Sequence, residues 1–211
     1  MEYAIEVKHV SKVFRDVKAL KDVDVSFSRG RIHGIIGRNG SGKTVLFKCI
    51  CGFMAVTEGE IRVDGELVRP SVAQNIGIII ENPGFIGSMS GLRNLKMLAA
   101  IHRRVGEREI VEVLTRVGLD PGMKKHVQKY SLGMRHRLGI AQAIMEKPDI
   151  LILDEPMNGL DKQGVIEIRT LLKELNEQGV TILLSSHYAE DIEALCDTVY
   201  EMEAGSLTQV R

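Results

Sequence analysis

The eight residues from Gly37 to Thr44 have the types and the spacing needed to bind a polyphosphate. They match the pattern G-x-x-x-x-G-K-[ST] and lie between an apolar strand over 32–36 and an apolar helix over 45–51. Glycines let backbone N–H groups curl around phosphate oxygens, and the helix that follows directs its positive end at them. The residues expected to contact the ligand are Gly37, Asn39, Gly40, Ser41, Gly42, Lys43, Thr44 and Val45.

Two side chains of this phosphate loop have expected roles of their own. Lys43 can bridge the β- and γ-phosphates, and the Thr44 hydroxyl can be a ligand of Mg²⁺. The alternative is a glycine-rich turn that binds nothing. It is disfavoured because both residues occupy the required positions after a strand.

A continuous apolar run over 150–153 ends in two carboxylates, Asp154 and Glu155. Such a run is typical of a parallel strand that is buried on both faces. In open α/β sheets the chemistry lies beyond the carboxyl ends of the strands. Asp154 is therefore expected to hold Mg²⁺, directly or through water, and Glu155 to orient or deprotonate an attacking water. The alternative is that the two acids merely open a loop. The phosphate loop upstream disfavours this alternative.

The composition fits one globular domain. The chain has 211 residues, 44% of them hydrophobic, and a formal net charge of zero. The zero charge argues against a general nucleic-acid binder, because affinity for the phosphate backbone comes mainly from clustered Lys and Arg. No apolar stretch approaches the ~20 residues that span a bilayer, and the N-terminus lacks a signal-peptide pattern. Three cysteines, Cys49, Cys51 and Cys196, are expected to be core residues in a reducing compartment.

Hydrophobic periodicity predicts alternating strands and helices. Strands are expected over 4–13, 23–27, 32–36, 76–80, 150–153, 180–184 and 199–202, with a hairpin over 60–68. Helices are expected from 91 to about 147 with a stop at Gly118, over 161–179, and over 189–196. The expected fold is a single α/β domain over 1–211. Together with the phosphate loop, this order of elements resembles a P-loop NTPase (RecA-like) core with an antiparallel β subdomain and an inserted α-helical subdomain at about 85–145.

Ser131 and Gly133 mark a second segment that could contact phosphate. They lie in Tyr130-Ser131-Leu132-Gly133-Met134, which opens a predicted helix with Ser131 as a natural N-cap. A serine hydroxyl and a glycine N–H at a helix start can bind a phosphate group. Considered alone, the segment is explained equally well by ordinary helix capping.

Taken in order, these segments resemble the nucleotide-binding subunit of an ATP-binding-cassette (ABC) transporter, from about residue 4 to 209. Ser131-Leu132-Gly133-Met134 occupies the place of the family's L-S-G-G-Q signature, and Asn158-Gly159-Leu160-Asp161 is similar to its D-loop. The resemblance implies ATP as the nucleotide and Asp161 as one of its contacts. It also implies that His187 is the switch histidine and that Phe14 stacks on adenine. A structural histidine and a core phenylalanine are the alternatives.

Several positions depart from the usual family pattern. They are Tyr130, Leu132 and Met134 in the signature, Val45 where many relatives have a hydroxyl beside the α-phosphate, and Glu81 in place of the Q-loop glutamine. Together with Ser185-Ser186-His187, these changes resemble the bacitracin-resistance and lantibiotic-immunity branch. That branch pairs with separate membrane subunits and exports peptide antibiotics.

The resemblance implies a head-to-tail dimer with two ATP molecules, each between one chain's phosphate loop and the other chain's signature. The second chain would be another copy or a paralogous cassette. ATP binding would close the dimer, hydrolysis would reopen it, and the 81–91 segment would pass this motion to a separate membrane permease. The chain is then expected in the cytoplasm, held on the inner face of the membrane by the permease, with no nucleic-acid partner.

Glu81 has an expected role beside the catalytic pair Glu155 and His187. It precedes the turn-forming run Asn82-Pro83-Gly84, and an ionised carboxylate can bind Mg²⁺ and sense the γ-phosphate. A surface glutamate that opens a loop is the alternative. Two other functions compete for the whole chain. A soluble ABC-type ATPase that acts on nucleic acid or ribosomes usually has tandem cassettes or coiled-coil insertions, and a non-catalytic cassette would not need both Glu155 and His187.

Overall fold

The structure is a computed structural model that describes residues 2–70, 75–81 and 83–211. Its strands are β1 (Tyr3–Phe14), β2 (Val17–Ser28), β3 (Ile32–Ile36), β4 (Glu58–Val63), β5 (Glu66–Leu67), β6 (Ile76–Ile79), β7 (Ile150–Asp154), β8 (Thr181–Ser185), β9 (Thr198–Glu203) and β10 (Ser206–Gln209). Its helices are α1 (Lys43–Ile50), α2 (Gly91–His102), α3 (Glu107–Arg116), the 3-10 turn η1 (Val127–Lys129), α4 (Leu132–Ile144), α5 (Lys162–Glu177) and α6 (Ala189–Leu195). Asn82, the first residue of the expected turn, lies outside the described residues.

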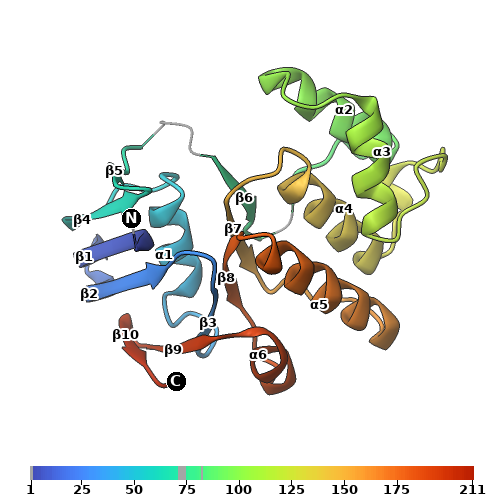
Figure 1. Ribbon diagram of the computed structural model, residues 1–211. Helices are drawn as coiled ribbons and strands as arrows, with labels where there is room; N and C mark the ends of the chain where they lie inside the picture. The colour runs from blue at the N-terminus through green and yellow to red at the C-terminus, as the bar shows by residue number, and fades with distance from the viewer. Residues whose placement is uncertain (1, 71–74, 82) are drawn as a thin grey trace.

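Two sheets organise the chain (Figure 1). An antiparallel sheet has the order β2-β1-β4-β5, and a larger sheet has the order β10-β9-β3-β8-β7-β6. Strands β9, β3, β8, β7 and β6 are parallel, and β10 joins the edge antiparallel to β9. Because β8 lies between β3 and β7, three strands that are distant in sequence end side by side. These ends carry the phosphate loop, Ser185 and Asp154.

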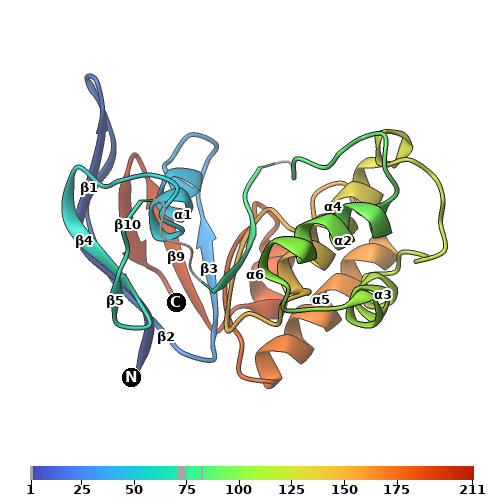
Figure 2. The same ribbon diagram turned by 90° about the horizontal axis from the view of Figure 1, so that it is seen from above.

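Both faces of the larger sheet are covered, which explains the continuous apolar runs of its strands. In β7, Leu151 and Leu153 pack into the core with α4 and α5, whereas Ile150 and Ile152 pack into the core with α1. Figure 2 shows α1 beside the antiparallel strands, with α2 to α6 on the other side of the larger sheet. The expected fold class, with its antiparallel β and helical layers, is confirmed.

Helices α2, α3 and α4 occupy the segment between β6 and β7, as the periodicity predicts. Gly118 follows α3 with φ 74°, a left-handed conformation that ends the helix. Tyr130, the residue before the α4 cap, is 6% exposed, and its hydroxyl accepts the N–H of Gly91 at 3.2 Å. This bond ties the start of α4 to the start of α2. The unusual tyrosine before the signature therefore has a packing role.

The sequence predicted that the strand over 199–202 is the last one. This prediction is wrong, because β10 follows it. Ala204 and Gly205 have φ 45° and 90° and form the two-residue turn between β9 and β10. Within β10 only Leu207 is apolar, so the alternating pattern that reveals other strands is absent. Strands β1 and β2 are also longer than predicted, since they stay paired as far as Phe14 and Val17, which are 41% and 66% exposed and lie outside the core.

The three cysteines are free and buried, as predicted. Burial raises the pKa of the Cys49 thiol to about 11, so this side chain stays protonated and acts as a small core residue. No helix in the described part of the chain is long and apolar enough to cross a membrane.

Candidate active site

The phosphate loop leaves β3 and enters α1 through a turn that requires glycine. Gly37 and Gly42 have φ 143° and 120°, which side chains rarely adopt. A Cβ at Gly37 would lie 2.3 Å from the carbonyl oxygen of Met202, and one at Gly42 would lie 2.8 Å from that of Ala19. The loop is therefore packed against neighbouring backbone on its outer side.

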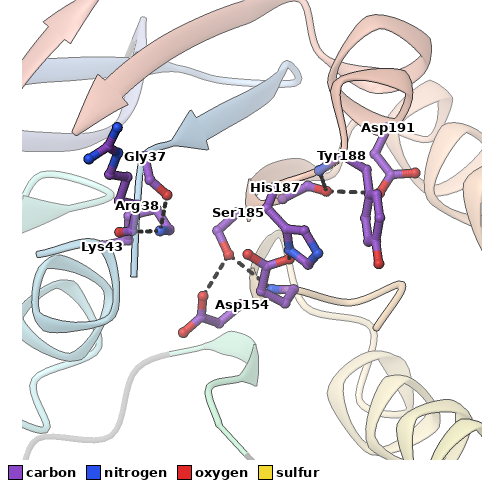
Figure 3. A network of polar contacts seen from close by, with 10 residues as sticks. Gly37, Arg38, Lys43, Asp154, Ser185, His187, Tyr188 and Asp191 are labelled. Carbon is purple, nitrogen blue, oxygen red and sulfur yellow. Dashed lines mark hydrogen bonds and ion pairs between the residues drawn. The ribbon is translucent and has the colours of Figure 1, made fainter. Parts of the chain in front are cut away.

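The Lys43 side chain forms hydrogen bonds with the backbone of this loop (Figure 3). Its Nζ donates to the carbonyl oxygens of Gly37 at 2.6 Å and Arg38 at 3.2 Å. An ammonium group has three donors, so one remains for a phosphate oxygen. Helix α1 has no side-chain cap and no acidic residue in its first turn, which leaves its positive end for an anion. The buried Ser41 Oγ has no hydrogen-bond partner among the described residues, and its hydroxyl is a further donor in the same loop.

Asp154 is held by hydroxyl groups from two other elements. Thr44 Oγ1, at the start of α1, donates to Asp154 Oδ2 at 2.7 Å, and Ser185 Oγ donates to Oδ1 at 2.6 Å. The register of β7 and β8 produces the second bond, because Asp154 pairs with Ser185. Hydroxyl and carboxylate oxygens are ligands that suit Mg²⁺. Within the described ranges no group of three His, Cys, Asp or Glu could hold a metal ion.

Glu155 follows with its backbone in the left-handed region, at φ 53°. Its N–H donates to the same Ser185 Oγ at 2.9 Å, so one hydroxyl orients both acids. Glu155 Oε2 lies 2.8 Å from His187 Nδ1, and the His187 ring packs on Tyr188 with centroids 4.0 Å apart. The left-handed backbone of Glu155 is a strained conformation for a residue other than glycine, and such strain is common at functional sites.

A cavity of about 360 Å³ opens over the phosphate loop. Its lining combines the loop, the acidic strand end and one residue of β2, and consists of Ala19, Asn39, Gly40, Gly42, Lys43, Thr44, Val45, Asp154 and Glu155. The structure thus brings together most of the predicted loop residues and both carboxylates. Sequence reasoning missed Ala19 and the bridging role of Ser185. For Ser185 the available signal was its position at the end of a strand, two residues before His187.

The predicted signature and D-loop residues lie apart from this cavity. Ser131 is exposed, and its hydroxyl accepts a backbone N–H of its own helix at 3.1 Å. Asp161 is also exposed and caps α5 in the same way at 2.8 Å. Gly133 packs against the D-loop so closely that a Cβ there would lie 2.9 Å from the carbonyl oxygen of Gly159. The two motifs therefore form one surface that does not line the chain's own phosphate cavity.

Phe14 and Glu81 also lie outside the cavity lining. The Phe14 side chain is on β1, 41% exposed, with Lys12 Nζ 5.0 Å from the ring centroid. Glu81 follows β6 with φ 61° and forms an ion pair of 2.6 Å with Lys48, on α1. The structure thus pairs Glu81 with a lysine, and not with Thr44 or Asp154.

The sequence pattern of the family described as ABC transporter matches residues 20–158. The chain belongs to the ABC transporter family. It is 40% identical to the uncharacterized ABC transporter ATP-binding protein YybJ of Bacillus subtilis (strain 168), over 96% of this chain and 94% of YybJ. It is 38% identical to the bacitracin transport ATP-binding protein BcrA of Enterococcus faecalis, over 99% of this chain and 69% of BcrA.

The fold has solved counterparts. A dimeric ATP-binding cassette, MJ0796, solved in a post-hydrolysis state with ADP and Pi, has a TM-score of 0.89 and 23% identity, covering 98% of this chain and 99% of that one. The comparisons confirm the predicted family and branch and identify the chain as an ABC-type ATPase, the ATP-binding subunit of a transporter. Nothing in them favours a soluble ATPase that acts on nucleic acid or ribosomes.

Ser185→Ala tests the hydroxyl that holds both acids. Because Ser185 is fully buried, the variant leaves Asp154 Oδ1 and the Glu155 N–H without this partner. We expect the free energy of unfolding, measured by urea denaturation, to fall by about 1–3 kcal/mol. We also expect ATP hydrolysis to fall at least about tenfold, because the Asp154 carboxylate and the backbone of Glu155 lose the group that orients them. The exposed Ser206→Ala is the matched control, and an unchanged hydrolysis rate in Ser185→Ala would contradict this role.

Proposed function

We propose that this chain binds ATP with Mg²⁺ and hydrolyses it at a site completed by a second cassette, and that hydrolysis drives a separate membrane permease. One observation supports the shared site above all. The residues for phosphate binding and water activation, Lys43, Thr44, Asp154 and Glu155, meet at one cavity, whereas Ser131 is exposed on another surface. A cassette with this division needs the signature of a partner chain to enclose the nucleotide.

In this proposal each side chain of the cavity has a separate task. Lys43 and the loop N–H groups hold the phosphates, and Glu155 accepts a proton from the attacking water. His187, in contact with Glu155, donates to the γ-phosphate. Thr44 and Asp154 would hold Mg²⁺, which neutralises charge that develops on the phosphates.

The second cassette, another copy or a paralogue, would supply Ser131, Gly133 and Asp161 to the nucleotide. The γ-phosphate then gathers donors from both chains, and its loss on hydrolysis removes the attraction between them. Phe14 has an exposed ring that can stack on adenine. Ala19, on the strand paired with β1, lines the phosphate cavity, which supports a base site at this end of the molecule.

A groove of about 460 Å³ beside β6 and α2 is the proposed contact with the permease. Its apolar lining includes Ile76, Ile78, Ile80 and Leu98. Two further lining residues, Phe53 and Ile101, are 65% and 70% exposed, and Arg104 and Glu146 contribute charge. An apolar groove with charged residues fits an amphipathic helix on the cytoplasmic side of a permease. This contact would hold the chain on the inner face of the membrane.

Glu81 lies next to this groove, because Ile80 lines it. We infer that Glu81 leaves Lys48 for the Mg²⁺-bound γ-phosphate when ATP binds, and that its movement relays closure to the permease. For the transported compound we infer export of a peptide antibiotic or a related amphipathic molecule. This inference rests on the bacitracin transport relative BcrA.

Glu155→Gln should abolish turnover and preserve ATP binding. The amide is similar in size to the carboxylate but does not accept a proton from water. We expect an ATP-dependent dimer, measured by light scattering. This dimer should persist, because the ATP that holds it together is not hydrolysed. Wild-type hydrolysis by this variant would exclude Glu155 as the general base.

Two inactive chains should complement each other when mixed. Lys43→Ala damages the phosphate loop, and Ser131→Arg damages the signature. In a mixed dimer both lesions fall in one composite site, and the other site is intact. ATPase activity should therefore recover on mixing. Continued inactivity in a mixed dimer, demonstrated by co-purification of two differently tagged chains, would argue against two independent shared sites.

Ile101→Glu tests the permease groove. The side chain is 70% exposed, so the charge has little effect on the fold, but it disfavours an apolar partner surface. We expect the isolated chain to keep its ATPase rate and the assembled transporter to lose co-purification and transport. Ile166→Glu, at a residue of α5 that is 56% exposed, is the matched control. Intact co-purification of Ile101→Glu would place the permease elsewhere.

A further inference from the structure

Behind His187 lies a buried chain of polar side chains, Ser186, Asp191 and Arg169, to which the sequence analysis assigns no role. Ser186, the residue before His187, is 2% exposed, and its Oγ donates to Asp191 Oδ2 at 2.8 Å. The same Oγ accepts the N–H of Tyr188 at 3.1 Å. The Ser186 hydroxyl, directly before His187, therefore bonds to two groups that follow His187 in the chain, the N–H of Tyr188 and the carboxylate of Asp191.

Asp191 is in turn fixed by Arg169. Asp191 lies on α6 and is 1% exposed, and Arg169 Nε and Nη2 donate to its Oδ1 at 2.9 and 2.5 Å. Both guanidinium donors go to one oxygen, Oδ1, and Ser186 donates to the other, Oδ2, so both oxygens of this carboxylate have fixed partners. Arg169 belongs to α5, the helix that Asp161 caps. The chain of contacts thus joins the D-loop helix to the segment of His187.

This anchorage matters because the His187 side chain is itself only partly enclosed. It is 51% exposed, its Nδ1 lies 2.8 Å from Glu155 Oε2, and its ring packs on that of Tyr188. Its backbone is consequently the main determinant of where the imidazole lies. A buried ion pair is weak evidence for stability, since apolar residues of similar volume often do as well. Control of geometry is the better account of Arg169 and Asp191.

We propose that Arg169, Asp191 and Ser186 are positioning residues that hold His187 in contact with Glu155. The inference rests on the proposed function, in which His187 and Glu155 act together at the γ-phosphate. The three residues do not touch the reacting atoms. They fix the backbone that carries the His187 imidazole. A small displacement of this ring relative to Glu155 lowers turnover more than it lowers nucleotide affinity.

Ser186→Ala tests the proposal without creating an unpaired buried charge, because Arg169 and Asp191 keep each other. With the full chain, ATP and Mg²⁺, we expect kcat to fall about tenfold and the KM for ATP to change less than about threefold. Histidine-labelled protein provides a second readout by NMR. The His187 ring resonance, identified by its loss in His187→Ala, should shift in Ser186→Ala.

If Asp191→Asn folds, it should also lower kcat and shift the His187 resonance. If this variant does not fold, Ser186→Ala alone provides the test. Glu190→Gln is the matched control, because Glu190 is the neighbouring acid on α6, 89% exposed and 3.9 Å from Arg169. It should leave kcat and the His187 resonance unchanged. For Ser186→Ala, a kcat within about twofold of wild type, or an unmoved His187 resonance, overturns the proposal. Wild-type rates in Glu155→Gln and His187→Ala would instead show that the proposed function has failed.

Discussion

The carboxylate of Asp154 is the point at which the core elements of this protein meet. One oxygen accepts the hydroxyl of Thr44, at the start of α1, and the other accepts the hydroxyl of Ser185, at the end of β8. These bonds require β8 to lie between β3 and β7 and require Asp154 and Ser185 to share a register position. A slip of one residue in β8 would turn Ser185 to the opposite face of the sheet and leave both acids without their common partner.

From this arrangement follows a division between two surfaces. The cavity over the phosphate loop collects the groups that we propose bind phosphate and activate water, because the parallel strands end at the same edge. The signature and D-loop contact each other on a separate surface, with Gly133 against Gly159. In the proposed function these two surfaces are the two parts of one nucleotide site. This is the physical reason for expecting the chain to work in pairs.

The departures from the usual family residues have different physical meanings. Tyr130 is a packing residue, because its hydroxyl bonds to the backbone at the start of α2. Val45 is a cavity wall, so it offers an apolar surface where a hydroxyl would offer a hydrogen bond. Glu81 is held by Lys48, a cation within reach because α1 and the end of β6 are neighbours. A glutamine at this position would not form that ion pair.

The sequence by itself determined the phosphate loop, the acidic strand end, the order of most elements and the family. Each of these is local: the glycine and lysine spacing from Gly37 to Thr44 and the apolar run before Asp154 carry their meaning within a few residues. Strand β10 escaped prediction because its residues are mostly polar. Only the tertiary structure decided that Ser185 orients both acids, that Lys48 pairs with Glu81, and that Arg169 reaches Asp191. Those contacts join residues up to 33 positions apart through sheet order and helix packing, and no local pattern specifies such pairings.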